Sequence, residues 1–254
     1  MRVLFSGTGA SDWKPEYREQ GEYRRFTSAI INEDLLLDPG PHIYDFAEWY
    51  GQEDCLGGIR DVLLTHSHDD HFQMDQLRRL CADKRIRFWC NEAVAPLVEE
   101  TEGLTVHKMP CFEPTCIGSY VVTAVPANHG TAIWQEQAVH YMIEQNGKRI
   151  FYGCDGAWLR RDAWYYMKNY KFDLMILDGT LGDAYGDHRI FEHNSLRMAE
   201  LMAETFRKTE VLKKQGKIMI THLSRKCHGT QAEVELRLGF AQIGVAYDGC
   251  AVEV

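Results

Sequence analysis

The chain has 254 residues, of which 45% are hydrophobic, and a formal net charge of −9. This is enough to bury a sizeable core, and we expect a single large domain that spans residues 1–254. The acidic balance argues against non-specific binding to nucleic acid or anionic membranes. The apolar run at the N-terminus is too short for a signal peptide, and no segment is long enough to span a bilayer. We therefore expect a soluble, cytoplasmic protein whose eight cysteines are free thiols.

Apolar runs of strand length recur along the chain, and helical patterns lie between some of them. Most of these runs are continuous, which predicts strands covered on both faces. We expect strands at 3–5, 29–31, 35–37, 62–64, 86–89, 120–125, 139–143, 150–152, 174–177, 218–220 and 245–247. We expect helices at 42–50, 72–82, 93–100, 157–169, 194–212 and 231–240. This order predicts an α/β fold of the αββα type, in which two mixed sheets pack between outer helices.

The densest polar cluster is THSHDDH, which follows the predicted strand at 62–64. If His66 and His68 lie at the end of that strand, they point the same way and can share one ion. Asp70 and His71 then face a second point nearby. Imidazole nitrogens and carboxylate oxygens suit zinc, and also manganese or iron. Because these groups are costly to bury without a partner, we interpret the cluster as half of a two-metal site. The alternative is a surface histidine cluster after a strand.

Three later strands each end in one residue that can bind a metal. His129 ends the run VVTAVPANHG, Asp155 ends RIFYGCDG, and His222 ends KIMITHLS. Strand ends are where sites in layered α/β folds are assembled. Taken alone, each residue has an ordinary alternative as a core histidine or a turn aspartate. Their agreement with the THSHDDH cluster predicts that all four segments meet at one site.

These motifs together resemble the metallo-β-lactamase superfamily. The resemblance extends from the GTG turn and the DPG at 38–40 to the YDG at 247–249. It implies an αββα hydrolase with two divalent ions, zinc being expected and manganese or iron possible. It also implies that a hydroxide formed from metal-bound water attacks the substrate. By this resemblance, the first ion would be held by His66, His68 and His129, the second by Asp70, His71 and His222, and both by Asp155.

Two further stretches are similar to the phosphodiesterase branch of that superfamily. They are LDGT at 177–180 and HNSLRMAELM at 193–202. This branch includes the tRNA 3′-processing endonuclease and a cyclic ribose-phosphate phosphodiesterase. The similarity implies that His193 assists at the scissile phosphate, with Asp178 behind it raising its pKa, while Asp70 also orients the attacking water. The alternatives are an ordinary residue at a helix start and an ordinary turn aspartate.

Some features of the relatives are missing from this chain. There is no Gly/Pro-rich arm for gripping tRNA and no N-terminal cysteine cluster for an accessory zinc, so we expect neither a tRNA substrate nor a third metal. We expect hydrolysis of a small-molecule or nucleotide phosphodiester, with cyclic phosphodiesters among the candidates. The oligomeric state stays open, with a homodimer as one candidate. Two alternatives remain open: lactone or ester hydrolysis at the same metals, and a non-catalytic protein that binds a small anion through them. Asp38 is expected to hydrogen-bond the ligand loop.

Overall fold

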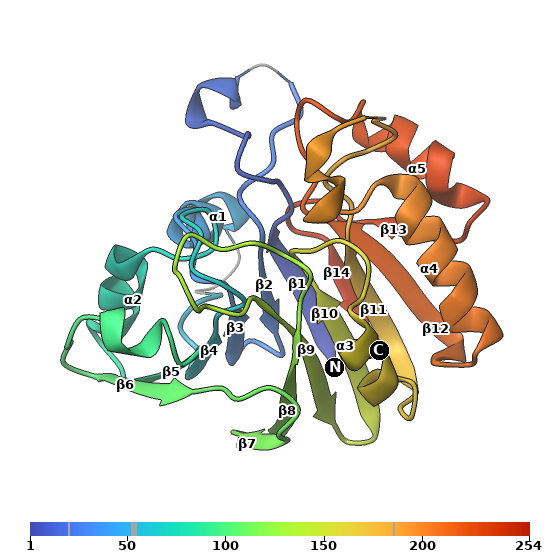
Figure 1. Ribbon diagram of the computed structural model, residues 1–254. Coiled ribbons are helices and arrows are strands. Elements are labelled where there is room, and N and C mark those ends of the chain that lie inside the picture. Colours follow the sequence, from blue (N-terminus) through green and yellow to red (C-terminus); the bar gives the residue numbers. More distant parts are fainter. Residues whose placement is uncertain (20, 52–54, 185) are drawn as a thin grey trace.

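Two sheets face each other in the computed structural model, which describes residues 1–19, 21–51, 55–184 and 186–254 (Figure 1). The strands of the first sheet lie in the order β14-β1-β2-β3-β4-β5-β6 and those of the second in the order β13-β12-β11-β10-β9-β8-β7. The first sheet contains β1 (Arg2–Gly7), β2 (Ser28–Ile31), β3 (Leu35–Leu37), β4 (Asp61–Leu63), β5 (Ile86–Cys90), β6 (Leu104–Lys108) and β14 (Ala251–Glu253). The second contains β7 (Thr115–Ile117), β8 (Tyr120–Pro126), β9 (Val139–Gln145), β10 (Lys148–Gly153), β11 (Phe172–Asp178), β12 (Leu212–Thr221) and β13 (Gly244–Val245).

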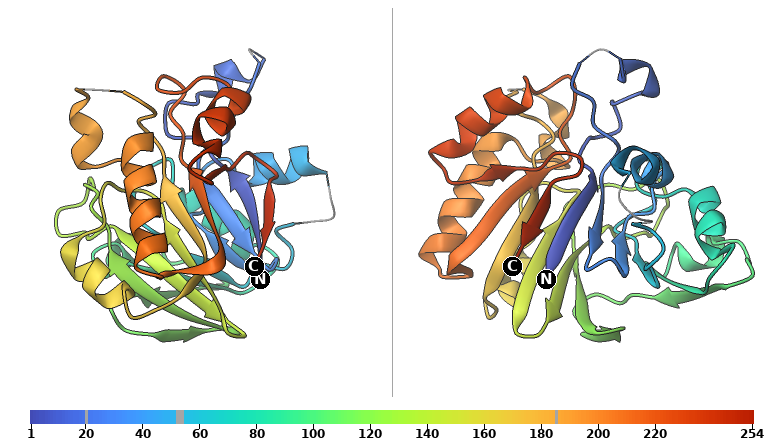
Figure 2. Two further views of the ribbon diagram at one scale, coloured as in Figure 1. Left: turned by 90° about the vertical axis from the view of Figure 1, so that its right-hand side faces the viewer. Right: turned by 180° about the vertical axis from the view of Figure 1, so that it is seen from behind.

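Helices cover the outer face of each sheet (Figures 1 and 2). Helices α1 (Ile43–Tyr50) and α2 (Met74–Cys81) pack on the first sheet, where Phe46 and Leu77 join Phe88 in one buried cluster. Helices α3 (Arg161–Met167), α4 (Leu196–Lys208) and α5 (Gln231–Gly239) pack on the second sheet, where Ala203 and Leu238 belong to another. The predicted αββα architecture is therefore confirmed. None of the helices in the described ranges has the length and apolar character needed to cross a membrane.

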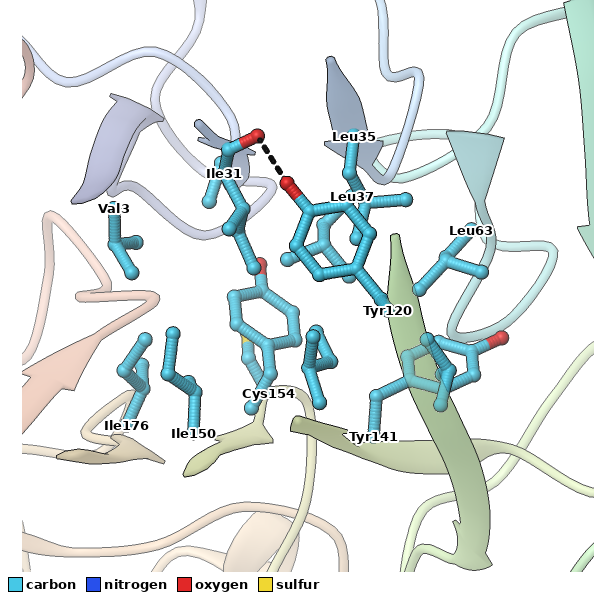
Figure 3. Close-up of a cluster of buried hydrophobic side chains, with 14 of the residues drawn as sticks. Val3, Ile31, Leu35, Leu37, Leu63, Tyr120, Tyr141, Ile150, Cys154 and Ile176 are labelled. Atoms are coloured by element: carbon cyan, nitrogen blue, oxygen red, sulfur yellow. Dashed lines mark hydrogen bonds between the residues drawn. The ribbon is translucent and has the colours of Figure 1, made fainter. Parts of the chain in front are cut away.

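A third cluster of buried side chains fills the space between the two sheets (Figure 3). Val3 and Leu37 come from the first sheet, and Tyr141 and Ile176 from the second; all four are buried. Burial of an aliphatic side chain of this size contributes about 1.5–3 kcal/mol. The contact between the sheets therefore fixes their relative position, and with it the loops that both sheets send to one edge.

That common edge follows from the strand directions. Strands β10, β11 and β12 are parallel, so their carboxyl ends meet on the same side of the second sheet. The backbone N–H of Val139, which begins β9, donates to the carbonyl of Thr65, which follows β4, at 3.0 Å. This bond joins the two sheets at the edge where the loops with candidate ligands begin. The chain termini lie together at the other end of the sandwich, where the Met1 amino group donates to the Val254 carbonyl at 3.0 Å (Figure 1).

Several predicted boundaries are wrong. The expected helix at 93–100 is only a 3₁₀ turn, Ala95–Leu97, because Pro96 lacks the backbone N–H that a longer helix needs. The helix expected at 194–212 ends at Lys208, and Leu212 instead begins β12, where it pairs with Phe172 of β11. The helix expected at 157–169 starts only at Arg161. The strand expected at 245–247 is β13, which ends at Val245, and Tyr247 lies in the turn between β13 and β14.

Candidate metal centre

Ring nitrogens of three histidines converge at the shared edge of the sheets. The Nε2 atom of His66 lies 2.9 Å from Nδ1 of His68, and Nε2 of His129 lies 3.2 Å from the same Nδ1 atom. His129 follows the end of β8. The sequence had suggested that His66 and His68 lie at the end of a strand. Because β4 ends at Leu63, both histidines lie instead in the loop beyond it. The loop still directs both rings toward one point, and we call these three residues the first triad.

A second set of donor atoms, the second triad, comes from Asp70, His71 and His222. The Nε2 atoms of His71 and His222 are 3.3 Å apart. The Oδ2 atom of Asp70 lies 3.7 Å from the first of these nitrogens and 3.5 Å from the second. His222 directly follows β12, and all three residues are buried.

One carboxylate oxygen lies between the two triads. Oδ2 of Asp155 is 3.7 Å from Nε2 of His129, 3.7 Å from Nε2 of His71 and 3.2 Å from Nε2 of His222. Asp155 follows β10 by two residues and is buried. The seven residues proposed as metal ligands from the sequence are thus brought together, with Asp155 placed to contact an ion in either triad.

A buried carboxylate orients His71. Oδ2 of Asp38 accepts a hydrogen bond from Nδ1 of His71 at 3.0 Å, and Oδ1 accepts one from the backbone N–H of Thr65 at 2.8 Å. Since Nδ1 carries the proton in this bond, Nε2 of His71 is left with a free lone pair for a cation. Asp38 therefore occupies the place behind the ligand loop that the sequence predicted for it.

A hydroxyl group orients His222 in the same way. Oγ1 of Thr180 accepts from Nδ1 of His222 at 2.8 Å and lies 2.9 Å from Oδ2 of Asp178, to which it donates. The Nδ1–H group of His129 is likewise directed at a backbone carbonyl, that of Glu192, at 3.1 Å. In each case Nδ1 is engaged by an acceptor, so Nε2 is the nitrogen that faces the centre.

His193 lies beside both triads and is held by two carboxylates. Its Nδ1 atom lies 2.9 Å from Oδ2 of Asp178, to which it donates, and 2.8 Å from Oδ1 of Asp155 without hydrogen-bond geometry. Its ring stacks on that of His222 with the centroids 5.6 Å apart. Burial opposes a positive charge on His193, but Asp155 and Asp178 outweigh it and raise the pKa of the imidazole to about 11. His193 is therefore a cation at neutral pH.

Asp178 is a rigid acceptor at the end of β11. Besides His193 it accepts from the backbone N–H groups of Thr180, at 2.8 Å, and Asn194, at 3.0 Å, through Oδ1. The side chain is fully buried. Asp178 thus connects the end of β11 to the residues before α4, and fixes the ring of His193 relative to the triads.

The electrostatics of the side chains call for cations in the centre. Burial works against ionisation of Asp70, yet His71 and His222 lower the pKa of its carboxyl group to about 2. Burial, helped by the neighbouring His71 and His129, lowers the pKa of His66 well below its usual value. The site therefore combines an ionised Asp70 with a neutral His66. Although burial opposes it, Asp70 and Asp38 raise the pKa of His71 to about 9, and a metal ion bound there would displace that proton, since metals bind the neutral imidazole. Oδ1 of Asp155 is buried and accepts no hydrogen bond, so it too has a lone pair for an ion. This donor set fits two divalent metal ions.

Comparison with known proteins identifies the family. Residues 33–222, which are most of the chain, match the family model of the beta-lactamase superfamily domain. The chain belongs to the metallo-β-lactamase superfamily. This match confirms the resemblance inferred from the motifs. The protein is therefore a hydrolase of this superfamily that carries a His/Asp metal-site cluster. No curated protein matches the sequence.

Solved structures of this superfamily share the fold at low sequence identity. The metallo-beta-lactamase fold protein YhfI from Bacillus subtilis superposes with a TM-score of 0.76 at 14% identity, covering 100% of this chain and 99% of its own. A diphosphatase from the PhnP family has a TM-score of 0.74 at 19% identity, with coverage of 100% and 97%. The short form of human tRNase Z has a TM-score of 0.71 at 19% identity, with coverage of 100% and 99%.

Two contacts of this metallo-β-lactamase superfamily site were not predicted. Glu136 binds Ser67, the residue between His66 and His68, and Thr180 links His222 to Asp178. Thr180 lies within the LDGT stretch already singled out, so its proximity to Asp178 was a usable signal. Glu136 lies in a loop with no recognisable motif, and its partner is 69 residues away in sequence.

Two histidines without a motif stay outside the cluster. His188, in the 3₁₀ turn η3 (His188–Phe191), has a side chain that is 93% exposed. His228 is bonded through Nε2 to the carbonyl of Gly179 at 2.7 Å. Neither contributes to a triad, so the ligand candidates remain those of the four motif segments.

Proposed function

We propose that the protein is a metal-dependent phosphodiesterase that acts on a small-molecule or nucleotide phosphodiester. The observation that carries this proposal is the position of His193, whose Nδ1 atom is bonded to Asp178 and lies 2.8 Å from Oδ1 of Asp155 at the margin of the paired triads. A partly exposed imidazole that can be protonated beside two metal ions favours a substrate with a negatively charged reacting group. The diphosphatase and the tRNase Z among the structural neighbours add support from the fold. We also propose that residues 1–254 form one domain, since His66 and His129 of the first triad come from different sheets.

In the proposed mechanism, the triads bind the metal ions and His193 transfers a proton. In this proposal the first triad would hold one ion and the second triad the other, and Asp155 is placed to reach an ion in either triad. Two divalent ions held there would supply Lewis acidity, activating water and stabilising negative charge on a phosphoryl group. Asp70 also accepts a hydrogen bond from the attacking water and so orients it. His193 donates the proton of Nε2 to the leaving oxygen, while Asp178 holds Nδ1 and keeps the ring in place. Zinc is the metal we propose, since five of the seven proposed ligands are imidazoles; manganese and iron accept the same donors.

The test is metal analysis of the purified protein followed by kinetics on four substrates. These are bis(p-nitrophenyl) phosphate, a cyclic nucleotide, a lactone and a thioester. We expect two metal ions per chain and turnover of the two phosphodiesters. Turnover of the lactone or the thioester, with neither phosphodiester cleaved, would overturn the proposal.

His193→Ala tests the role of the imidazole as an acid. A ribose alkoxide is a poor leaving group that needs a proton, whereas p-nitrophenolate leaves without one. The substitution should therefore lower kcat for the cyclic nucleotide by about 10²–10⁴-fold, and should affect bis(p-nitrophenyl) phosphate much less. His188→Ala, an exposed histidine of the neighbouring 3₁₀ turn, is the matched control. Unchanged kcat for the cyclic nucleotide in His193→Ala would contradict the role assigned to His193.

A further inference from the structure

Three large aromatic side chains remain exposed on the loops that carry the metal centre. Trp134 is 89% exposed, Phe191 76% and Trp158 43%. Trp134 lies five residues after His129, Trp158 three after Asp155, and Phe191 two before His193. Side chains of this size gain most from burial, so a group of them left in solvent next to a site indicates a contact made when a ligand is bound.

The residues next to Trp158 and Phe191 are bonded to the same short piece of chain. The N–H of Ala157, the residue before Trp158, donates to the carbonyl of Asn128 at 3.1 Å. On the other side, the carbonyl of Glu192, the residue after Phe191, accepts from Nδ1 of His129 at 3.1 Å.

Two histidine rings next to Asn128 and Glu192 also lie close together. Those of His129 and His193 are 5.0 Å apart between centroids. Each of the two exposed aromatics is therefore one residue away in sequence from a residue bonded to position 128 or 129, next to the ring pair of His129 and His193.

Trp134 is presented by a separate, tightly held turn. The N–H of Glu136 donates to the carbonyl of Ile133 at 3.1 Å, so Trp134 and Gln135 are the two central residues of this turn. The carboxylate of Glu136 is bonded to Ser67, between His66 and His68. In Figure 1 the loop between β8 and β9, which contains this turn, arches over the same end of the sheets as the loop after β4. Trp134 is thus fixed on the side of the first triad.

We propose that Trp134, Trp158 and Phe191 bind the planar ring of the substrate, which makes the preferred substrate a nucleotide phosphodiester. This inference rests on the proposed function, because it assigns the phosphoryl group to the metal centre and the base to the aromatic loops beside it. Indole and phenyl faces stack on any nucleobase, since every base has a π-face. The loops therefore select for a base in general and not for one particular base.

The experiment compares the binding of adenosine 5′-monophosphate and ribose 5-phosphate to the metal-loaded protein by calorimetry. The two ligands share the sugar and the phosphate and differ in the base. We expect the wild-type protein to bind the nucleotide at least about 10-fold more tightly, given the usual strength of base stacking. Trp158→Ala and Phe191→Ala should each reduce this preference by about 5-fold or more and leave the affinity for ribose 5-phosphate unchanged. Trp134→Ala should lower the preference as well.

A matched control comes from an exposed aromatic side chain away from the centre. Phe240, at the end of α5, is 98% exposed, and Phe240→Ala should keep the full preference for the nucleotide. Quenching of tryptophan fluorescence by the nucleotide in the wild-type protein is a second readout that needs no variant. Equal affinity for the two ligands in the wild-type protein, or an unchanged preference in both Trp158→Ala and Phe191→Ala, would overturn the inference. Because binding is measured without turnover, this failure is distinct from an absence of phosphodiester hydrolysis, which would overturn the proposed function.

Discussion

Glu136 accepts two hydrogen bonds from Ser67, one from the backbone N–H at 2.8 Å and one from the hydroxyl at 2.5 Å. Ser67 separates His66 from His68, and Glu136 belongs to the loop between β8 and β9, which also carries His129. This carboxylate therefore ties together the two chain segments that provide the whole first triad. The side chain of Glu136 is half-buried, and a carboxylate in such a place is costly unless it is hydrogen-bonded.

Glu136→Ala should weaken the first metal site more than the second. With the carboxylate gone, the loop after β4 loses its link to the loop after β8, and the first triad loses its fixed geometry. Loss of a residue that positions ligands usually costs about 10–100-fold in metal affinity. We expect one of the two ions to be released about that much more easily when the protein is titrated with a chelator.

Glu136→Gln is the control for this variant. The amide oxygen can still accept from the Ser67 N–H, so the affinity should fall less than in Glu136→Ala. Two ions held with wild-type affinity by Glu136→Ala would show that the bond to Ser67 does not support the site.

The contrast between Glu136 and the triads shows what the sequence could reveal. His66, His68, Asp70 and His71 stand within six positions, and such crowding is itself a signal. His129, Asp155 and His222 could be found because each ends an apolar run, which marks a strand end. Glu136 ends no such run and acts only through a residue 69 positions away, so no local sequence pattern indicates its role.

The same reasoning explains the strands that were missed. β6 lies at the edge of its sheet and has largely exposed or half-buried residues, so it lacks the continuous apolar run of a strand covered on both faces. β7 and β14 are also edge strands, each of three residues. The covered strands, such as β11 with all seven residues buried, were the ones that the apolar pattern located. The centre is built on these covered strands, which is why most of the site could be predicted although the edges could not.

Gly40→Ala should disrupt the second triad. A Cβ atom at this position would lie 2.3 Å from the backbone carbonyl oxygen of Asp70, an approach that a backbone atom cannot relieve without moving the loop. Asp70 and His71 would be displaced, and the affinity for the second ion should fall by about 10-fold or more. Metal content per chain after dialysis measures this. Gly239→Ala is the matched control, because no atom lies within 4 Å of its added Cβ. If Gly40→Ala retains both ions, the close contact with Asp70 is not needed for the site.

Asp38→Ala should destabilise the protein even without metal. Asp38 accepts from the N–H and the hydroxyl of Thr65 and from Nδ1 of His71, and all these groups are buried. An unsatisfied buried donor costs about 1–3 kcal/mol, so the free energy of unfolding should fall by at least about 2 kcal/mol. Urea unfolding of the metal-free protein measures the change.

Asp38→Asn separates the loss of charge from the loss of the acceptor. Asp38 has a φ of 59°, in the left-handed region that asparagine also tolerates, and the amide oxygen can still accept. We expect a smaller loss of stability than for alanine. A free energy of unfolding for Asp38→Ala within about 0.5 kcal/mol of the wild-type value would contradict the role of Asp38 as a shared acceptor.

His42 should make the fold sensitive to acid. Its Nδ1 atom accepts from the backbone N–H of Phe26 at 3.1 Å, and burial, which outweighs the attraction of Asp45, lowers the pKa of the imidazole to about 4. In the unfolded chain this pKa is about 6.5. Between these two values only the unfolded chain binds the proton, so His42 makes the free energy of unfolding fall as the pH drops from about 6.5 to about 4.

His42→Asn tests this coupling, because an asparagine oxygen can accept the same hydrogen bond and does not titrate. The loss of stability between about pH 7 and about pH 4.5 should be smaller for His42→Asn than for the wild-type protein, as measured by urea unfolding with a chelator present. His140, whose pKa is also lowered to about 4 by burial, titrates in both proteins and cancels in the difference. An equal loss of stability in the two proteins would mean that His42 takes up its proton in the folded state as readily as in the unfolded chain.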